Sequence, residues 1–147
     1  MSSPSRDLLH ALPKTDLHVH LDGSLRPGTV LELARERDLL PELRSEADVL
    51  AVCRAPETCA SLEEYLQVFD VTLTVMQDAA ALERIARELA EDAHQENVRW
   101  LEVRYAPILH QQGGLELDQV VAAVQRGLDH ARRQYGIASG QIICGIR

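Results

Sequence analysis

The first clear hydrophobic pattern in this chain is a strict alternation of polar and apolar side chains over residues 15–21 (TDLHVHL). Side chains of a β-strand point alternately to its two faces, so the alternation predicts a strand with one apolar face and one ionisable face. The ionisable face carries Asp16, His18, His20 and Asp22. A glycine and a serine follow and are expected to end the strand.

Helical periodicity follows this strand. Pro27 stands where the first turn of a helix tolerates proline, which predicts a helix over about 27–38. Residues 41–60 are mixed in pattern and are interpreted as a connection with one short helix. Ser61 and Glu64 have capping-box spacing before an amphipathic series, and a second series comes after it. The apolar positions are Leu62, Tyr65, Leu66, Phe69, Leu73 and Met76 in the first series, and Leu82, Ile85, Ala86, Leu89, Ala90 and Ala93 in the second.

The last third of the chain predicts strand, helix and strand. Residues 98–106 are rich in β-branched and aromatic side chains and stop at Pro107. Apolar residues at helical spacing over 117–131 predict a helix that Gly136 ends, and residues 141–147 (QIICGIR) predict a third, buried strand. This order predicts parallel strands joined by crossover helices, an α/β fold. Because an apolar strand is left without a covering helix, we expect a C-terminal truncation.

Composition narrows the class of protein. The 147 residues, 46% of them hydrophobic, suit one domain, and the 3% of aromatic residues favour helices packed on a sheet. A formal net charge of −8 disfavours binding to nucleic acid or to an anionic membrane. No stretch approaches the roughly 18 apolar residues of a membrane span or forms the core of a secretory signal. Cys53, Cys59 and Cys144 lack C-x-x-C spacing, so we expect inert thiols and a cytoplasmic protein.

The histidine pair is the leading candidate for chemistry. Imidazoles at positions i and i+2 of a strand point the same way, close enough to bind one divalent ion, and their neutral nitrogens suit zinc. In a parallel sheet the ionisable face lines a cleft or a barrel interior, with His20 and Asp22 at the carboxyl end where active sites lie. The alternative is an exposed edge strand with a solvated polar face.

The other charged side chains and histidines give weaker evidence of a functional role. Glu102 and Arg104 share one face of the second strand, so we expect Arg104 to pair with Glu102 or with Asp16 as structural electrostatics. Four histidines have no ligand spacing to one another and are expected at the surface: His10, His94, His110 and His130.

The run LPKTDLHVHLDGSLRP over residues 12–27 resembles the first strand and loop of the adenosine deaminase family of metal-dependent (β/α)8-barrel hydrolases. The resemblance continues, in the family's order, through SLEEYLQVF over 61–69, EVRYAP over 102–107 and IICGIR over 142–147. It implies that residues 1–147 are the N-terminal part of a single deaminase barrel domain. The expected fold is therefore the N-terminal portion of a TIM barrel, about three strands with their intervening helices.

The resemblance also implies roles for particular residues. His18 and His20 match two zinc ligands of a site that holds one Zn²⁺ per complete subunit, and His20 and Asp22 match positions that bind the nucleoside. An apolar wall and gate at the mouth of the pocket is matched by Leu62, Tyr65, Leu66 and Phe69. For these four residues the alternative is ordinary core packing at helical spacing.

The implied activity is zinc-dependent hydrolytic deamination of a purine nucleoside, adenosine to inosine and ammonia. The family's H-A-G-E-like and N-T-D-D-P-like segments, which supply the remaining ligands and the proton donor, are absent from these residues. Catalytic residues are thus expected beyond Arg147, and this chain alone is expected to be nearly inactive.

Three alternatives stay open from the sequence. The substrate could be adenine or aminofutalosine rather than adenosine. A different metal-dependent hydrolase could use the same D-x-H-x-H strand on a cyclic amide or a phosphoester. The chain could also be a non-catalytic binding or assembly piece. The expected partner is a small purine nucleoside, without nucleic acid or membrane, and the oligomeric state is open.

Overall fold

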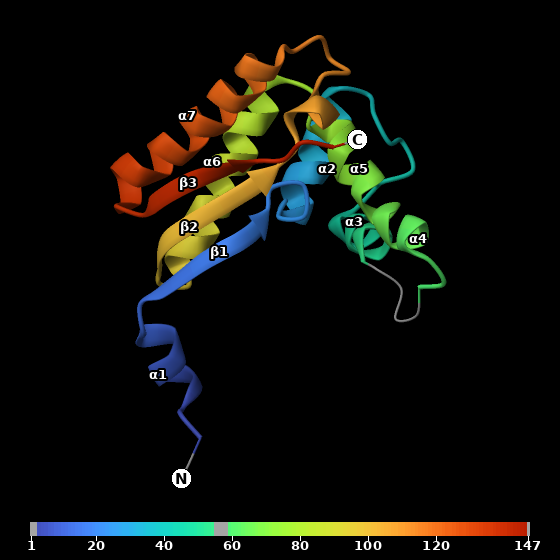
Figure 1. The fold of residues 1–147 in the computed structure, drawn as a ribbon. Helices are drawn as coiled ribbons and strands as arrows, with labels where there is room; N and C mark the ends of the chain where they lie inside the picture. Colours follow the sequence, from blue (N-terminus) through green and yellow to red (C-terminus); the bar gives the residue numbers. More distant parts are fainter. Residues whose placement is uncertain (1–2, 55–58, 147) are drawn as a thin grey trace.

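A parallel sheet forms the centre of the computed structural model, which describes residues 3–54 and 59–146. Its strands are β1 (Lys14–His20), β2 (Val98–Tyr105) and β3 (Ala138–Ile143), hydrogen-bonded in the order β1-β2-β3. Two long helices, α6 (Ala79–Gln95) and α7 (Leu117–Tyr135), lie together on one face of the sheet (Figure 1). The opposite face is open, with Trp100 of β2 41% exposed. The parallel α/β architecture predicted from the sequence is confirmed.

The shorter helices lie near the ends of the strands (Figure 1). Helix α1 (Arg6–Ala11) precedes β1 at its amino end, and the other short helices gather beyond the carboxyl ends. They are α2 (Pro27–Glu36), α3 (Glu46–Cys53), α4 (Leu62–Leu66), α5 (Val68–Val75) and the 3-10 helix η1 (Pro107–His110). No helix in the described ranges is both long and apolar enough to cross a membrane.

Several predicted boundaries agree with the structure because local chemistry sets them. Helix α2 begins at Pro27 as predicted, and α7 ends at Gly136, whose φ of 72° lies in the left-handed region that favours glycine. The short helix predicted within 41–60 is α3, which begins with a capping box between Ser45 and Asp48. The side chain of Glu64, on which the other predicted capping box depends, lies outside the described residues.

Two predicted elements differ from the structure. The helical series over 62–76 is divided into α4 and α5, since Asp70 N–H donates to Gln67 O at 3.1 Å, a three-residue spacing tighter than that of an α-helix. The third strand runs over Ala138–Ile143, not 141–147, because it pairs with β2 from Trp100 to Tyr105. It is half-buried rather than buried, since helices cover one side of it, and Arg147 lies outside the described residues.

The part of the hydrophobic core that anchors β2 lies between this strand and the two long helices. Leu101, Val103 and Tyr105 of β2 are at most 2% exposed. They pack against buried side chains of α6 and α7, among them Leu82, Ile85, Leu89, Val120, Val124 and Leu128. The apolar face of β2 therefore anchors the strand, and its other side chains, including Arg104, point to the open face.

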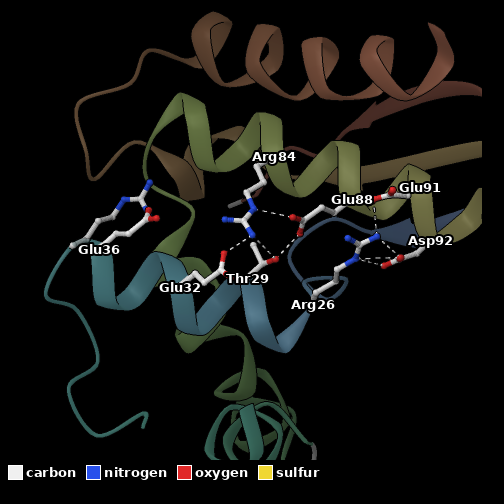
Figure 2. Close-up of polar contacts among 9 residues, drawn as sticks. Arg26, Thr29, Glu32, Glu36, Arg84, Glu88, Glu91 and Asp92 are labelled. Carbon is white, nitrogen blue, oxygen red and sulfur yellow. Dashed lines mark hydrogen bonds and ion pairs between the residues drawn. The ribbon is translucent and has the colours of Figure 1, made fainter. Parts of the chain in front are cut away.

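A network of hydrogen bonds and ion pairs joins α2 to α6 (Figure 2). Arg26 donates to both Glu91 and Asp92 near the end of α6, at 2.8 and 2.5 Å. Nearer the middle, the buried Glu88 carboxylate accepts from the Thr29 hydroxyl at 2.6 Å and from a guanidinium of α6 at 2.8 Å. A buried carboxylate with two donors is compensated, so the network holds the segment that follows β1 in a fixed place.

Candidate active site

A cavity of about 620 Å³ opens at the carboxyl ends of the strands. Parallel α/β folds place their active sites at this edge. The strand β1 and its following loop contribute His18, His20 and Asp22, and α4 and α5 contribute Tyr65, Leu66, Phe69 and Asp70. The remaining lining includes Leu73, Tyr105, Ala106, Leu109, Cys144 and Ile146. Residues more than 100 positions apart in the sequence thus line the same cavity.

The two imidazoles of β1 lie side by side at this cavity. The ring centroids of His18 and His20 are 5.3 Å apart, with their planes tilted by 30°. Two imidazoles bound to one tetrahedral zinc ion at ~2.0 Å need centroids roughly 5 Å apart, so the pair fits half of such a site. Within the described residues no group of three or more metal-ligating side chains comes together. Further ligands are therefore needed for a closed zinc site.

Arg104 contacts His18 rather than the carboxylates predicted for it. Its Nη1 lies 2.7 Å from Nε2 and 3.3 Å from Nδ1 of His18, and its Nη2 lies 3.5 Å from Cys144 Sγ. Glu102 instead accepts from the Trp100 indole, and Asp16 accepts from the His18 backbone N–H. The pairing of Arg104 with Glu102 or Asp16 is thus wrong in this structure. Since a guanidinium only donates, zinc binding at His18 Nε2 would require Arg104 to move.

Asp22 presents a buried acceptor without a donor. Its side chain is 15% exposed, and Oδ1 has no hydrogen-bond partner in the described part of the chain. The imidazole Nδ1 of His20 lies 3.7 Å from this oxygen, beyond hydrogen-bond distance. Buried polar atoms are nearly always satisfied, so this oxygen is ready to accept from a ligand or from water.

An aromatic pair forms the apolar wall of the cavity. The rings of Tyr65 and Phe69 meet edge to face with centroids 6.1 Å apart, and Leu66 lies beside them in the lining. Leu62 is not among the lining residues and is 67% exposed. The structure therefore brings six of the seven predicted site residues to one cavity and leaves Leu62 outside it.

Sequence reasoning missed several lining residues. Asp70 directly follows Phe69, so a reading of the whole helical turn could have included it. Leu109, Cys144 and Ile146 reach the cavity through chain folding that no local pattern signals. Tyr105 belongs to the apolar face of β2, where it is 2% exposed, and it also lines the cavity.

The predicted surface position is correct for two of the other four histidines. His10 and His130 are exposed. His94 is half-buried, because its ring stacks on Tyr135 with centroids 5.2 Å apart. His110 is fully buried, because η1 turns it inward so that Nδ1 lies 3.1 Å from the Met76 carbonyl oxygen. The surface prediction is wrong for these two residues.

Comparisons with known proteins agree with this geometry. The chain is 49% identical over 136 residues to an adenosine deaminase of Vibrio vulnificus, covering 92% of this chain and 41% of the relative. Among solved structures, it superimposes with a TM-score of 0.78 on a zinc-bound amidohydrolase of Burkholderia ambifaria, at 31% identity over 94% of this chain and 37% of that one. It also matches Arabidopsis ADAL complexed with GMP, with a TM-score of 0.68, 35% identity, and coverage of 85% and 36%.

The chain therefore spans about two fifths of the length of these relatives. The structural matches confirm the predicted fold, the N-terminal portion of a TIM-barrel hydrolase. The family model described as adenosine deaminase matches residues 13–147. This chain belongs to the adenosine deaminase family.

Proposed function

We propose that the protein containing this chain catalyses zinc-dependent hydrolytic deamination of a purine nucleoside, adenosine to inosine and ammonia. The observation that carries the proposal is the shared cavity of the His18–His20 pair and the unpartnered Asp22 carboxylate. The similarity to proteins named adenosine deaminase and to a zinc-bound amidohydrolase supports it.

Each part of the cavity has a task in this reaction. His18 and His20 would hold zinc, which supplies Lewis-acid activation of water. Asp22 accepts a hydrogen bond from a sugar hydroxyl, and the Tyr65–Phe69 wall excludes bulk water from the purine. Water adds to the ring carbon that carries the amino group, the carbon–nitrogen bond breaks, and ammonia leaves. The proton donor and the other ligands belong to family segments that these residues do not contain.

The charge of the cavity favours a nucleoside over a nucleotide. Its described lining includes the carboxylates of Asp22 and Asp70, and the guanidinium of Arg104, which contacts the lining residues His18 and Cys144, offsets only one of these two charges. A phosphate monoester brings roughly −1.5 to −2 charges at pH 7 and would be repelled there. Free adenine, in turn, lacks a sugar hydroxyl that could donate to the Asp22 carboxylate. Adenosine meets both conditions.

The test is a deamination assay on the full-length protein with adenosine, AMP and adenine as substrates. We expect turnover of adenosine on the order of 10 per second, loss of activity with a chelator and recovery with zinc. We expect kcat/KM for AMP to be lower by roughly two orders of magnitude. Equal or better turnover of AMP or adenine would contradict the nucleoside assignment, and full activity in metal-free protein would contradict the zinc assignment.

Matched histidine variants locate the metal. His18→Ala and His20→Ala should each reduce the zinc content measured by mass spectrometry of the metal and remove nearly all turnover. The control is His130→Ala, which changes an exposed histidine of α7 and should leave both unchanged. If the β1 variants keep full zinc and activity, the ligand assignment is wrong.

The isolated 147-residue chain should show almost no turnover, and activity near that of the full-length protein would contradict this.

A further inference from the structure

A fully buried histidine lies beside the candidate site and has no assigned task. His110, at the end of η1, is 0% exposed, and its ring lies 6.1 Å from that of Tyr105, which lines the cavity. Its Nδ1 lies 3.1 Å from the Met76 carbonyl oxygen. Its Nε2 is buried and has no hydrogen-bond partner among the described residues. Buried polar atoms of this kind need an explanation.

The contact with Met76 fixes the form of the ring. A carbonyl oxygen only accepts, so Nδ1 of His110 carries a proton and donates it. Burial lowers the pKa of His110, and this effect exceeds the raising effects of the Met76 carbonyl and of the Asp22 charge. The imidazole is therefore neutral near pH 7, and Nε2 presents a lone pair.

A second acceptor without a donor among the described residues lies in the loop that follows β1. Asp22 follows β1 and His110 follows β2, and the two strands are adjacent and parallel. The Leu21 N–H donates to the Arg104 carbonyl at 3.0 Å, which joins the carboxyl ends of the two strands one residue before Asp22 and six residues before His110. Like His110 Nε2, Asp22 Oδ1 is buried and has no donor in the ranges that the structure describes. A water molecule donates two hydrogen bonds, so one water between these two acceptors would satisfy both of them.

We propose that His110 is a positioning residue for Asp22, through one buried water that donates to both His110 Nε2 and Asp22 Oδ1. The water fixes the direction of the carboxylate, so that its other oxygen points at the sugar hydroxyl. This inference rests on the proposed function for the role of Asp22, although the link between the two side chains does not depend on it.

Two substitutions of His110 separate positioning from simple structural support. Asparagine places its amide near the position of Nδ1, so His110→Asn keeps the bond to Met76 and removes the acceptor for water. Glutamine places its amide near Nε2, so His110→Gln keeps an acceptor for water and loses the bond to Met76. In the full-length protein, His130→Asn is the control at an exposed position.

Steady-state kinetics with adenosine give the first readout. We expect His110→Asn to raise KM about tenfold with kcat within about threefold of wild type, because ground-state binding is what it loses. His110→Gln should stay within about threefold of wild type in both constants, and His130→Asn should match wild type. In an Asp22→Asn background, His110→Asn should change KM by less than about twofold. A larger KM for His110→Gln than for His110→Asn, or effects that simply add, would overturn the proposal.

A readout without activity separates this proposal from the proposed function. If the wild-type protein deaminates no purine nucleoside, the proposed function fails. The pair is then judged by urea unfolding of the two single variants and the double variant, together with a high-resolution crystal structure. Non-additive unfolding free energies and an ordered water between the two side chains would support the link. Additive values with no such water would refute it.

Discussion

The contact between α6 and α7 at Gly127 leads to a quantitative prediction for stability. A Cβ atom added at Gly127 would lie 2.2 Å from the Glu83 carbonyl oxygen and 2.9 Å from Ala86 Cβ. Both are parts of a packed helix that cannot swing aside. For Gly127→Ala, the helices must separate by roughly an ångström to restore van der Waals contact.

The expected cost follows from two opposing terms. Overpacking a well-packed interface costs about 3 kcal/mol at the upper end of its usual range. Alanine has a higher helix propensity than glycine, which raises the free energy of unfolding by about 1 kcal/mol and offsets part of this cost. Gly127→Ala should therefore lower the free energy of unfolding by about 2 kcal/mol, close to a 30-fold change in the folding equilibrium.

Urea unfolding of the full-length protein, followed by circular dichroism, measures this change. The matched control is Gly28→Ala in α2, where the added Cβ meets the Glu46 carboxylate oxygen at 3.1 Å, the far end of a flexible side chain. That variant should be neutral or up to about 1 kcal/mol more stable than wild type. If Gly127→Ala is as stable as Gly28→Ala, the two long helices do not pack as closely as the structure indicates.

Three further predictions concern charge. Glu88→Ala removes a carboxylate of a residue that is 5% exposed and should lower the free energy of unfolding in urea by about 3 kcal/mol. Glu32→Ala, at the exposed end of the same network, should lower it by under about 0.5 kcal/mol. Equal losses for the two variants would contradict the buried role of Glu88. The Tyr135 hydroxyl, and then an arginine, hold the pKa of Glu91 below 4.5, so the stability that they contribute is present above pH 4.5 and is lost as pH falls through the lowered pKa. The stability difference between Tyr135→Phe and wild type should thus shrink in acid, and a difference that stays constant from pH 7 to pH 3 would exclude this linkage. Asp70→Lys should raise kcat/KM for AMP relative to adenosine about tenfold, and an unchanged ratio would show that Asp70 does not repel the phosphate.

The sequence predicts best what depends on near neighbours in the chain. The alternation over residues 15–21 places His18 and His20 on one face, because the period of a strand is two residues whatever surrounds it. The end of α7 at Gly136 also follows from one residue, which takes a backbone conformation that other residues disfavour. These local rules are sufficient to predict the order of the helices and strands and to place the two histidines side by side.

Burial of an irregular segment depends instead on contacts between distant residues. His110 stands in a short 3-10 helix, where no periodicity separates an inner from an outer face. Its burial depends on Met76, 34 positions earlier, whose carbonyl oxygen receives the ring N–H. The third strand shows the same limit, because its start at Ala138 is set by pairing with Trp100 and not by its own apolar residues.

Arg104 shows that predicting the face of a strand on which a side chain lies is not sufficient to predict the side chain that it contacts. Period-two alternation places its side chain on the same face of β2 as that of Glu102, as predicted. Its partner, however, depends on how far β1 and β2 are shifted relative to each other, and the observed register sets Arg104 opposite His20, next to His18. One step of register would bring different side chains within reach of the guanidinium. The pairing at the candidate metal site is therefore a property of the sheet as a whole, and Arg104 contacts the His18 nitrogen that a metal ion bound at Nε2 would need.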